Sequence, residues 1–331
     1  MNNMLANKSI LVTGAGGFIG SHLVERLVQS GASVRAFVRY TSRADTGLLR
    51  LASPQIASKI TLIGGDLRDY DAVRKAVKDC DYVFHLGALI AIPYSYLHPV
   101  EVAQTNLMGT LNVLMACRDY GVKRLIHTST SEVYGTALTE KIGESHPLQA
   151  QSPYSASKIG ADKLAESFFC SYDLPVVTVR PFNTYGPRQS ARAVIPTIIT
   201  QALAQKMIRL GNLHTVRDFT YVSDTVNGFI CAAVADKVEG ASFNLGTGSA
   251  IEIGELAELV IKKVGVDVKV EVDENRLRPQ KSEVRRLLSD NSLALKHLGW
   301  RPEISFESGI EKTIDWIKAN LDLYRVGTYE L

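Results

Sequence analysis

The stretch ILVTGAGGFIG at residues 10–20 decides the fold of this chain. A short β-branched run leads into three glycines, Gly14, Gly17 and Gly20, and an amphipathic helical pattern over 18–30 follows them. Glycine at such positions lets the backbone turn tightly and approach a pyrophosphate, which binds at the N-terminus of the next helix. The stretch therefore predicts the first strand, loop and helix of a Rossmann-type dinucleotide-binding domain.

Strand and helix patterns alternate along the chain beyond this loop. Further buried strands are expected at 34–38, 60–63, 82–86, 125–127 and 176–179, and helices at 69–79, 99–120 and 152–172. Such alternation is typical of a parallel sheet with helices on both faces. We predict an α/β fold built on a doubly wound parallel sheet.

The second half of the chain predicts a smaller unit that is interleaved with the first. After Pro181 the pattern becomes rich in loops. Short helices are expected near 252–264 and 306–320. We predict a Rossmann domain over 1–181 that regains sheet structure near 219–248. A smaller C-terminal α+β domain for the substrate takes the remaining segments, 182–218 and 249–331.

The composition excludes several classes of protein. The chain has 331 residues, 46% of them hydrophobic and 21% charged, unlike disordered or coiled-coil chains. The net charge of +3 includes no dense basic block, and the longest apolar runs are strand-sized, so we expect neither a nucleic-acid nor a membrane partner. The N-terminus lacks a signal-peptide pattern, which predicts a cytoplasmic protein. The cysteines and histidines lack metal-ligand spacing, so no metal site is expected.

The residues after the second strand bear on which dinucleotide binds. The sequence FVRYTSR at 37–43 has no acidic residue, whereas an acid at this place would bind the ribose 2′-hydroxyl of NAD. Arg39, Ser42 and Arg43 instead suit the 2′-phosphate of NADP, although a solvated loop with incidental charges has the same residues. We predict NADP as the preferred cofactor and NAD as the alternative.

Tyr154 and Lys158 form the candidate catalytic pair. In the stretch YSASK at 154–158 they lie four residues apart, on one face of a helix. A free tyrosine has a pKa of about 10, and a neighbouring ammonium together with a cofactor ribose lowers it by ~3 units. Tyr154 would then take a hydroxyl proton from a substrate while hydride passes to a nicotinamide.

The glycine loop, the tyrosine–lysine pair and the hydroxyl-rich stretch from Thr128 to Ser131 resemble the extended branch of the short-chain dehydrogenase/reductase superfamily. The resemblance implies that Thr130 bonds the reacting hydroxyl of the substrate. The other dinucleotide contacts that it implies come from Phe18, Ile19, Asp66, Leu67, Leu86, Ala88, Thr128 and Pro181. It also implies a homodimer, built by the helix that carries Tyr154 and its neighbour near 100–118.

A nucleotide-sugar site is expected after the sixth strand. The resemblance implies that Asn183 contacts the sugar phosphates and that Val194 and Ile195 lie beside the base. A guanidinium can bind two phosphate oxygens at once, which makes arginine suited to a diphosphate. The candidates are Arg188, Arg217 and Arg278, and a surface ion pair is the alternative role for each.

The stretch Thr130-Ser131-Glu132 resembles that of sugar-nucleotide 4,6-dehydratases and UDP-glucuronate decarboxylases. Oxidation at C4 acidifies the C5 proton, which Glu132 would remove. The usual dehydratase pattern has Asp where Ser131 stands, so Glu132, a water or Ser131 as a relay would protonate the departing 6-hydroxyl. Segments at 92–96, 189–196 and 276–284 further resemble 4,6-dehydratases of the legionaminic, pseudaminic and related nonulosonic acid pathways, which act on nucleotide-linked N-acetylglucosamine.

These features together predict an NAD(P)-dependent 4,6-dehydratase, a hydro-lyase, of UDP- or GDP-N-acetylglucosamine. Release of a 5,6-ene or inversion at C5 stays open, as does the nucleotide. The alternatives within the same fold are decarboxylation of UDP-glucuronate and C4 epimerisation of a UDP-sugar. An NADP-binding regulatory protein without catalysis would have a degraded tyrosine, lysine and threonine set, whereas this chain keeps all three.

Overall fold

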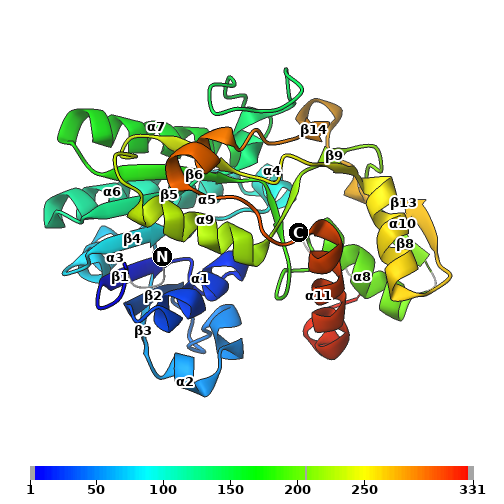
Figure 1. Cartoon of the computed structure of the whole chain (residues 1–331), viewed down its shortest axis with the longest axis horizontal. Helices are drawn as coiled ribbons and strands as arrows, with labels where there is room; N and C mark the ends of the chain where they lie inside the picture. The colour runs from blue at the N-terminus through cyan, green and yellow to red at the C-terminus, as the bar shows by residue number, and fades with distance from the viewer. Residues whose placement is uncertain (1–3, 206, 327–331) are drawn as a thin grey trace.

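A sheet of seven parallel strands forms the centre of the molecule, in the order β11-β6-β5-β4-β1-β2-β3 (Figure 1). The computed structural model describes residues 4–205 and 207–326, and element counts refer to these. The strands are β1 (Ser9–Thr13), β2 (Ser33–Arg39), β3 (Ile60–Gly65), β4 (Tyr82–His85), β5 (Arg124–Thr128), β6 (Val176–Pro181) and β11 (Ser242–Leu245). The strand order reverses between β1 and β4, which confirms the predicted doubly wound sheet. Ligands bind such sheets at the carboxyl ends of the strands.

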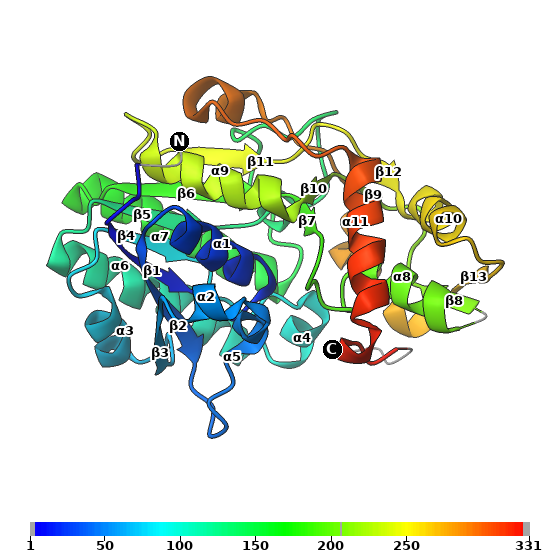
Figure 2. The same ribbon diagram turned by 60° about the horizontal axis from the view of Figure 1, so that its bottom comes forward.

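The strands pack between two helical layers. Ile10 and Val12 of β1 belong to one buried cluster, whereas Leu11 between them belongs to the other. The first cluster includes α1 (Phe18–Gln29) and α9 (Val222–Val234), and the second includes α3 (Tyr70–Val77), α6 (Gly109–Tyr120) and α7 (Pro153–Tyr172) (Figure 2). Burial on both faces explains why β1 reads as a continuous apolar run.

Side-chain caps fix where the helices of the second layer begin. Asp69 precedes α3, and its carboxylate accepts hydrogen bonds from the N–H groups of Asp71 and Ala72. At the start of α7, Ser152 and Ser155 form a capping box in which each side chain accepts from the backbone of the other. This cap orders the first turn of α7, the turn that carries Tyr154.

The helix expected over 99–120 is interrupted by a wider π-helical turn. It consists of α5 (Pro99–Ala103), η2 (Gln104–Met108) and α6. The wide turn buries Asn106, whose amide donates to Leu89 O at 2.9 Å and to Ser157 Oγ at 3.0 Å. The predicted helix over 99–120 is therefore confirmed, with one π turn that joins the loop after β4 to α7. Such turns are frequent at functional sites.

The later part of the chain forms a second unit beside the sheet, on the right of Figure 1. Its helices are α8 (Val194–Ala204), α10 (Ile253–Val264) and α11 (Phe306–Ala319). Its short strands are β7 (Asn183–Tyr185) with β10 (Phe219–Tyr221), β8 (Met207–Leu210) with β13 (Lys269–Val272), and β9 (Val216–Arg217) between β12 (Ile251–Glu252) and β14 (Arg286–Leu287). Only β11 of the expected return at 219–248 joins the main sheet, because β10 pairs with β7 and the next residues form α9.

The remaining elements are short. They are α2 (Pro54–Ala57), α4 (Ile92–Leu97) and the single turns η1 (Gly47–Leu51), η3 (Ser131–Tyr134), η4 (Glu274–Arg276), η5 (Gln280–Ser282), η6 (Ala294–Leu298) and η7 (Leu321–Leu323). Within the two described ranges, no helix has both the length and the apolar character that a membrane crossing requires.

Candidate active site

The glycine loop after β1 leaves no room for side chains. Gly14 has a φ of 68°, and a β-carbon there would lie 2.7 Å from Gly87 N. A β-carbon at Gly20 would lie 2.2 Å from Gly14 O. Gly17 precedes α1 without any side-chain cap, so the first N–H groups of the helix stay available to an anion. The loop therefore has the form that a pyrophosphate requires.

Gly14→Ala is expected to weaken dinucleotide binding at least about tenfold, because the new methyl group meets backbone atoms of the loop after β4. The matched control is Gly121→Ala, since Gly121 has a φ of 61° but no atom within 4 Å of an added β-carbon. Both variants lose about 1 kcal/mol of unfolding free energy through left-handed strain. Fluorescence titration with NAD⁺ and NADP⁺ checks the difference, and equal affinities of the two variants would contradict it.

A cavity of about 150 Å³ lies beside the glycine loop, at the carboxyl ends of β2, β3 and β4. Five of the predicted dinucleotide residues line it, namely Gly14, Arg39, Asp66, Leu67 and Ala88. Ser42 and Arg43 do not line it and are exposed. The position at the strand ends is where a doubly wound sheet holds the adenosine half of a dinucleotide.

The three charged residues that line this cavity, Arg39, Asp66 and Arg68, already have partners. Asp66 pairs with Arg68 at 2.6 Å, and the hydrogen bond from Arg68 lowers the pKa of the Asp66 carboxyl. The Arg39 guanidinium lies 3.6 Å from the carboxylate of Glu101 in α5. Glu101 also accepts a hydrogen bond from the Tyr94 hydroxyl. A carboxylate therefore lies beside Arg39, although the second strand itself ends without one.

Tyr154, Lys158 and Thr130 come together at the carboxyl end of β5. Both α7 side chains are buried, and the Lys158 ammonium donates to Thr128 O at 2.6 Å. Burial lowers the pKa of Lys158 to about 8, and the charge of Asp162 opposes this shift. Burial raises the pKa of Tyr154 well above its usual range, although a hydrogen bond with Thr130 opposes the rise. The pair thus has the proximity that proton transfer from a substrate hydroxyl needs.

Glu132 lies on the same side of α7 as Tyr154, and its charge contributes to the raised pKa of that tyrosine. Its carboxylate is 3.9 Å from Nη1 of Arg278, a buried nitrogen with no hydrogen-bond partner. Arg217 is buried next to both and lies 3.7 Å from Glu283. The charged cluster near Tyr154 thus consists of two carboxylates, Glu132 and Glu283, and two arginines, Arg217 and Arg278. Ser131 is buried.

Of the other predicted residues, some lie near the strand ends and others are held by polar partners. Phe18, Ile19, Leu86 and Val194 are half-buried along the strand ends and the first turns of α1 and α8, and Pro181 ends β6. Asn183 starts β7 and donates to Asp218 O at 3.3 Å. Arg188 instead forms an ion pair with Glu25 of α1 at 2.8 Å.

The side chain of Ile195 is only 1% exposed and belongs to the hydrophobic core. The structure therefore does not bring Ile195 to an open surface. Of the two residues expected beside the nucleotide base, Val194 is the one that remains a candidate.

Sequence reasoning missed three buried residues that support this site. Asn106 joins the loop after β4 to α7, and Thr13 Oγ1 lies 2.7 Å from Nδ1 of His85 while accepting from the Gly87 N–H. Asp162 follows Lys158 by one helical turn. The four-residue spacing that joins Tyr154 to Lys158 continues to Asp162, so that pattern was available in the sequence. The roles of Asn106 and Thr13 had no such signal.

Comparisons with known proteins agree with this geometry. The family model for GDP-mannose 4,6 dehydratase matches residues 11–313. The chain is 32% identical over 317 residues to a dTDP-glucose 4,6-dehydratase of Actinoplanes sp., covering 94% of this chain and 98% of that protein.

Two solved structures show the same similarity. The dTDP-glucose 4,6-dehydratase DesIV of Streptomyces venezuelae with NAD bound has a TM-score of 0.85 and 30% identity, covering 96% of this chain and 99% of that one. The UDP-N-acetylglucosamine 4-epimerase of Methanobrevibacter ruminantium in complex with UDP-N-acetylmuramic acid has a TM-score of 0.86 and 31% identity, covering 95% and 99%. Similar proteins thus include both dehydratases and epimerases.

Proposed function

This chain belongs to the GDP-mannose 4,6 dehydratase family of nucleotide-sugar enzymes, and on that premise we propose that it is a 4,6-dehydratase of UDP- or GDP-N-acetylglucosamine. One observation carries the choice of reaction: the carboxylate of Glu132 lies 3.9 Å from Arg278 and close enough to the buried Tyr154 for its charge to raise the pKa of that tyrosine. A dehydratase needs a base for the C5 proton, whereas C4 epimerisation does not. The product, a 4-keto-6-deoxy sugar nucleotide, fits the nonulosonic acid pathways that the sequence motifs suggest.

The proposed chemistry assigns each proton to a residue of this chain. Gly14, Arg39, Asp66, Leu67 and Ala88 line the cavity that would hold the dinucleotide, whose nicotinamide would supply reversible hydride transfer at C4 and C6 of the sugar. Tyr154 takes the proton of the 4-hydroxyl with help from Thr130 and the Lys158 ammonium. Glu132 takes the C5 proton once C4 is a ketone. Two protons therefore leave the sugar and two return, one in the departing water and one at C5, so the reaction is redox-neutral overall.

The arginines near Glu132 favour one second candidate function, decarboxylation of UDP-glucuronate. That reaction requires a cation beside the C5 carboxylate, and Arg278 lies 3.9 Å from Glu132 with Arg217 close by. In the dehydratase these guanidiniums would instead bind the diphosphate and orient Glu132. The two reactions differ in the mass that the substrate loses.

Mass spectrometry of reaction mixtures tests the proposal directly. The purified protein is incubated separately with UDP-N-acetylglucosamine, GDP-N-acetylglucosamine and UDP-glucuronate. Loss of one water from either N-acetylglucosamine nucleotide is expected, and it also identifies the carrier nucleotide. Loss of carbon dioxide from UDP-glucuronate, with both other substrates unchanged, would move the assignment to the decarboxylase. An epimer of unchanged mass, separated by chromatography, would move it to the epimerase.

The identity of the dinucleotide depends on Arg39. The sequence favoured NADP, but the solved dehydratase relative carries NAD. A 2′-phosphate beside Arg39 would also meet the Glu101 carboxylate 3.6 Å away. We therefore propose NAD as the resident cofactor, with Glu101 in the role that an acid after the second strand has in other Rossmann domains.

Glu101→Gln is expected to shift the ratio of NADP⁺ to NAD⁺ affinity toward NADP⁺ by about threefold to tenfold, because it removes the negative charge beside Arg39. Glu258→Gln, which changes an exposed carboxylate on α10, is the matched control. Fluorescence titration of both variants with both dinucleotides measures the ratio. An unchanged ratio in Glu101→Gln would refute the role assigned to Glu101.

We also propose that the enzyme is a homodimer. α5 and η2 pack beside α7 and leave Val100 and Met108 exposed at 67% and 47%. Exposed apolar side chains on neighbouring helices suit an interface between two copies. Sedimentation equilibrium is expected to give twice the chain mass, and a monomer would contradict the proposal.

A further inference from the structure

Asp162 is a buried carboxylate on α7, next to the catalytic pair Tyr154 and Lys158. It follows Lys158 by one turn of α7, and only 4% of it is exposed. Its Oδ2 accepts hydrogen bonds from the Ser129 hydroxyl at 2.8 Å and from Nη2 of Arg180 at 3.0 Å. Its Oδ1 lies 3.1 Å from Nε2 of His127. Every partner is fixed to the sheet, so the carboxylate is held in one place.

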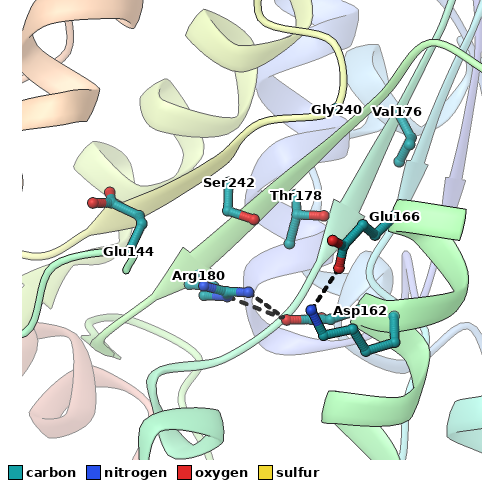
Figure 3. Close-up of a pocket in the computed structure, with 9 residues that line it drawn as sticks. Glu144, Asp162, Glu166, Val176, Thr178, Arg180, Gly240 and Ser242 are labelled. Carbon is teal, nitrogen blue, oxygen red and sulfur yellow. Dashed lines mark hydrogen bonds and ion pairs between the residues drawn. The ribbon is translucent and has the colours of Figure 1, made fainter. Parts of the chain in front are cut away.

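Asp162 and Arg180 also line a second cavity, of about 220 Å³, between α7, β6 and the edge strand β11 (Figure 3). The figure shows the two side chains pointing toward one another, with Thr178 and Ser242 above them. None of Thr130, Glu132 and Tyr154 lines this cavity. The charge network therefore contacts the catalytic pair on one side and a separate polar cavity on the other.

The buried cluster around Asp162 contains three charged groups. Lys158 and Arg180 are cations, and Asp162 is the carboxylate that lies between them. Burial alone would raise the pKa of Asp162, but the hydrogen bond from His127 and the charges of Arg180 and Lys158 hold it below its usual value. Two positive charges thus share one negative charge, which leaves the buried cluster with an excess of one positive charge.

The titratable groups that surround the cluster add no further charge to it. Burial lowers the pKa of His85 on β4 and of His127 on β5, which keeps both rings neutral. Burial also raises the pKa of Tyr134, whose hydroxyl accepts from Arg180, to about 12.

Three carboxylates lie farther out. Burial raises the pKa of Glu144, and that carboxylate accepts from the Asn244 N–H. The charge of Glu132 acts on Tyr154 and raises the pKa of that tyrosine. Glu166, one turn beyond Asp162, is exposed and paired with Lys163.

We propose that Asp162 is a positioning residue that, together with Arg180, sets the charge behind the catalytic pair, so that Lys158 remains an ammonium while Tyr154 takes the proton of the substrate. The assignment of Tyr154 and Lys158 to proton transfer rests on the proposed function. The charge balance within the cluster does not, since it follows from contacts of the ligand-free chain.

The proposal predicts shifts of opposite sign for the two partners. Asp162→Asn leaves Lys158 near the Arg180 cation without a counterion, so Lys158 should lose its proton at a pH lower by about one unit or more. Arg180→Gln leaves Asp162 with Lys158 as its only cation, so the ammonium should persist to higher pH. Glu166→Gln, on the same helix and lining the same cavity, should leave the titration unchanged.

Carbon-13 NMR of the full chain labelled at the lysine ε-carbon measures this titration directly. The Lys158 resonance is assigned by its absence from the spectrum of Lys158→Met. Downward and upward shifts of the midpoint in Asp162→Asn and Arg180→Gln, with no shift in Glu166→Gln, would support the proposal. Midpoints equal to wild type in a folded Asp162→Asn protein would overturn it. If Asp162→Asn does not fold, an unshifted or lowered midpoint in Arg180→Gln overturns it instead.

The pH dependence of turnover separates this proposal from the proposed function. If nucleotide-sugar turnover is found, its alkaline limb should move in the same directions as the NMR midpoints. A purely structural role for Asp162 would reduce turnover at every pH without moving the limb, which would overturn the proposal. Shifted NMR midpoints without dehydration of any of the tested substrates would leave the positioning role in place and refute the dehydratase assignment.

Discussion

Tyr154→Phe is expected to reduce nucleotide-sugar turnover by about a thousandfold while leaving dinucleotide affinity within about twofold of wild type. The phenyl ring fills the same buried site, so only the hydroxyl that bonds Thr130 is removed. General acid–base catalysis contributes between about 10² and 10⁴ to a rate. The first step, removal of the 4-hydroxyl proton, would therefore lose its base.

Mass spectrometry of the product and fluorescence titration of the dinucleotide check the two halves of this prediction. Tyr70→Phe is the matched control, because it removes the hydroxyl of a half-buried α3 tyrosine that bonds Asp119 and lines neither cavity. Turnover by Tyr154→Phe within tenfold of wild type would show that another group accepts the proton.

Glu132→Gln is expected to stop the reaction after its first step. The amide cannot accept the C5 proton, so dehydration should fall by about a thousandfold, whereas oxidation at C4 needs only Tyr154, Lys158 and Thr130. Reduced dinucleotide should then accumulate to about one molecule per site. Its near-ultraviolet absorbance, followed after mixing with substrate, measures this accumulation. The amide also preserves the size of the side chain beside Arg278.

Glu274→Gln, an exposed carboxylate on the loop that carries Arg278, should behave as wild type and serves as the control. Turnover by Glu132→Gln at the wild-type rate would remove Glu132 from the mechanism. A variant that neither dehydrates nor accumulates reduced dinucleotide would place Glu132 in substrate binding or in the oxidation step, which the proposed sequence of steps does not allow.

The sheet was predictable because its strands are buried on both faces and therefore read as uninterrupted apolar runs. Ile10, Leu11 and Val12 show this, since each packs although they face alternate layers. The pair Tyr154 and Lys158 was predictable because helical spacing is local. The same spacing extends to Asp162, which the sequence analysis did not consider.

The remaining contacts depend on residues that are distant in sequence. Whether Arg39 meets a phosphate or a carboxylate depends on Glu101, sixty-two positions later, in the first turn of α5. The burial of Ile195 depends on how α8 packs against α10 and α11 within the second unit. The ion pair of Arg188 with Glu25 likewise joins the second half of the chain to its first helix. Neither composition nor periodicity contains these pairings.

The chain enters and leaves the second unit more than once, passing from β6 to β7, back through α9 and β11, and out again to β12. The segment from Arg217 to Arg278 therefore cannot be deleted or exchanged as one continuous piece. It contains β11, so its deletion would also remove that strand from the edge of the main sheet. Swapping this region between relatives would require at least two grafts made together. A change of sugar preference is thus reached more readily by single substitutions within an intact chain than by recombination of whole modules.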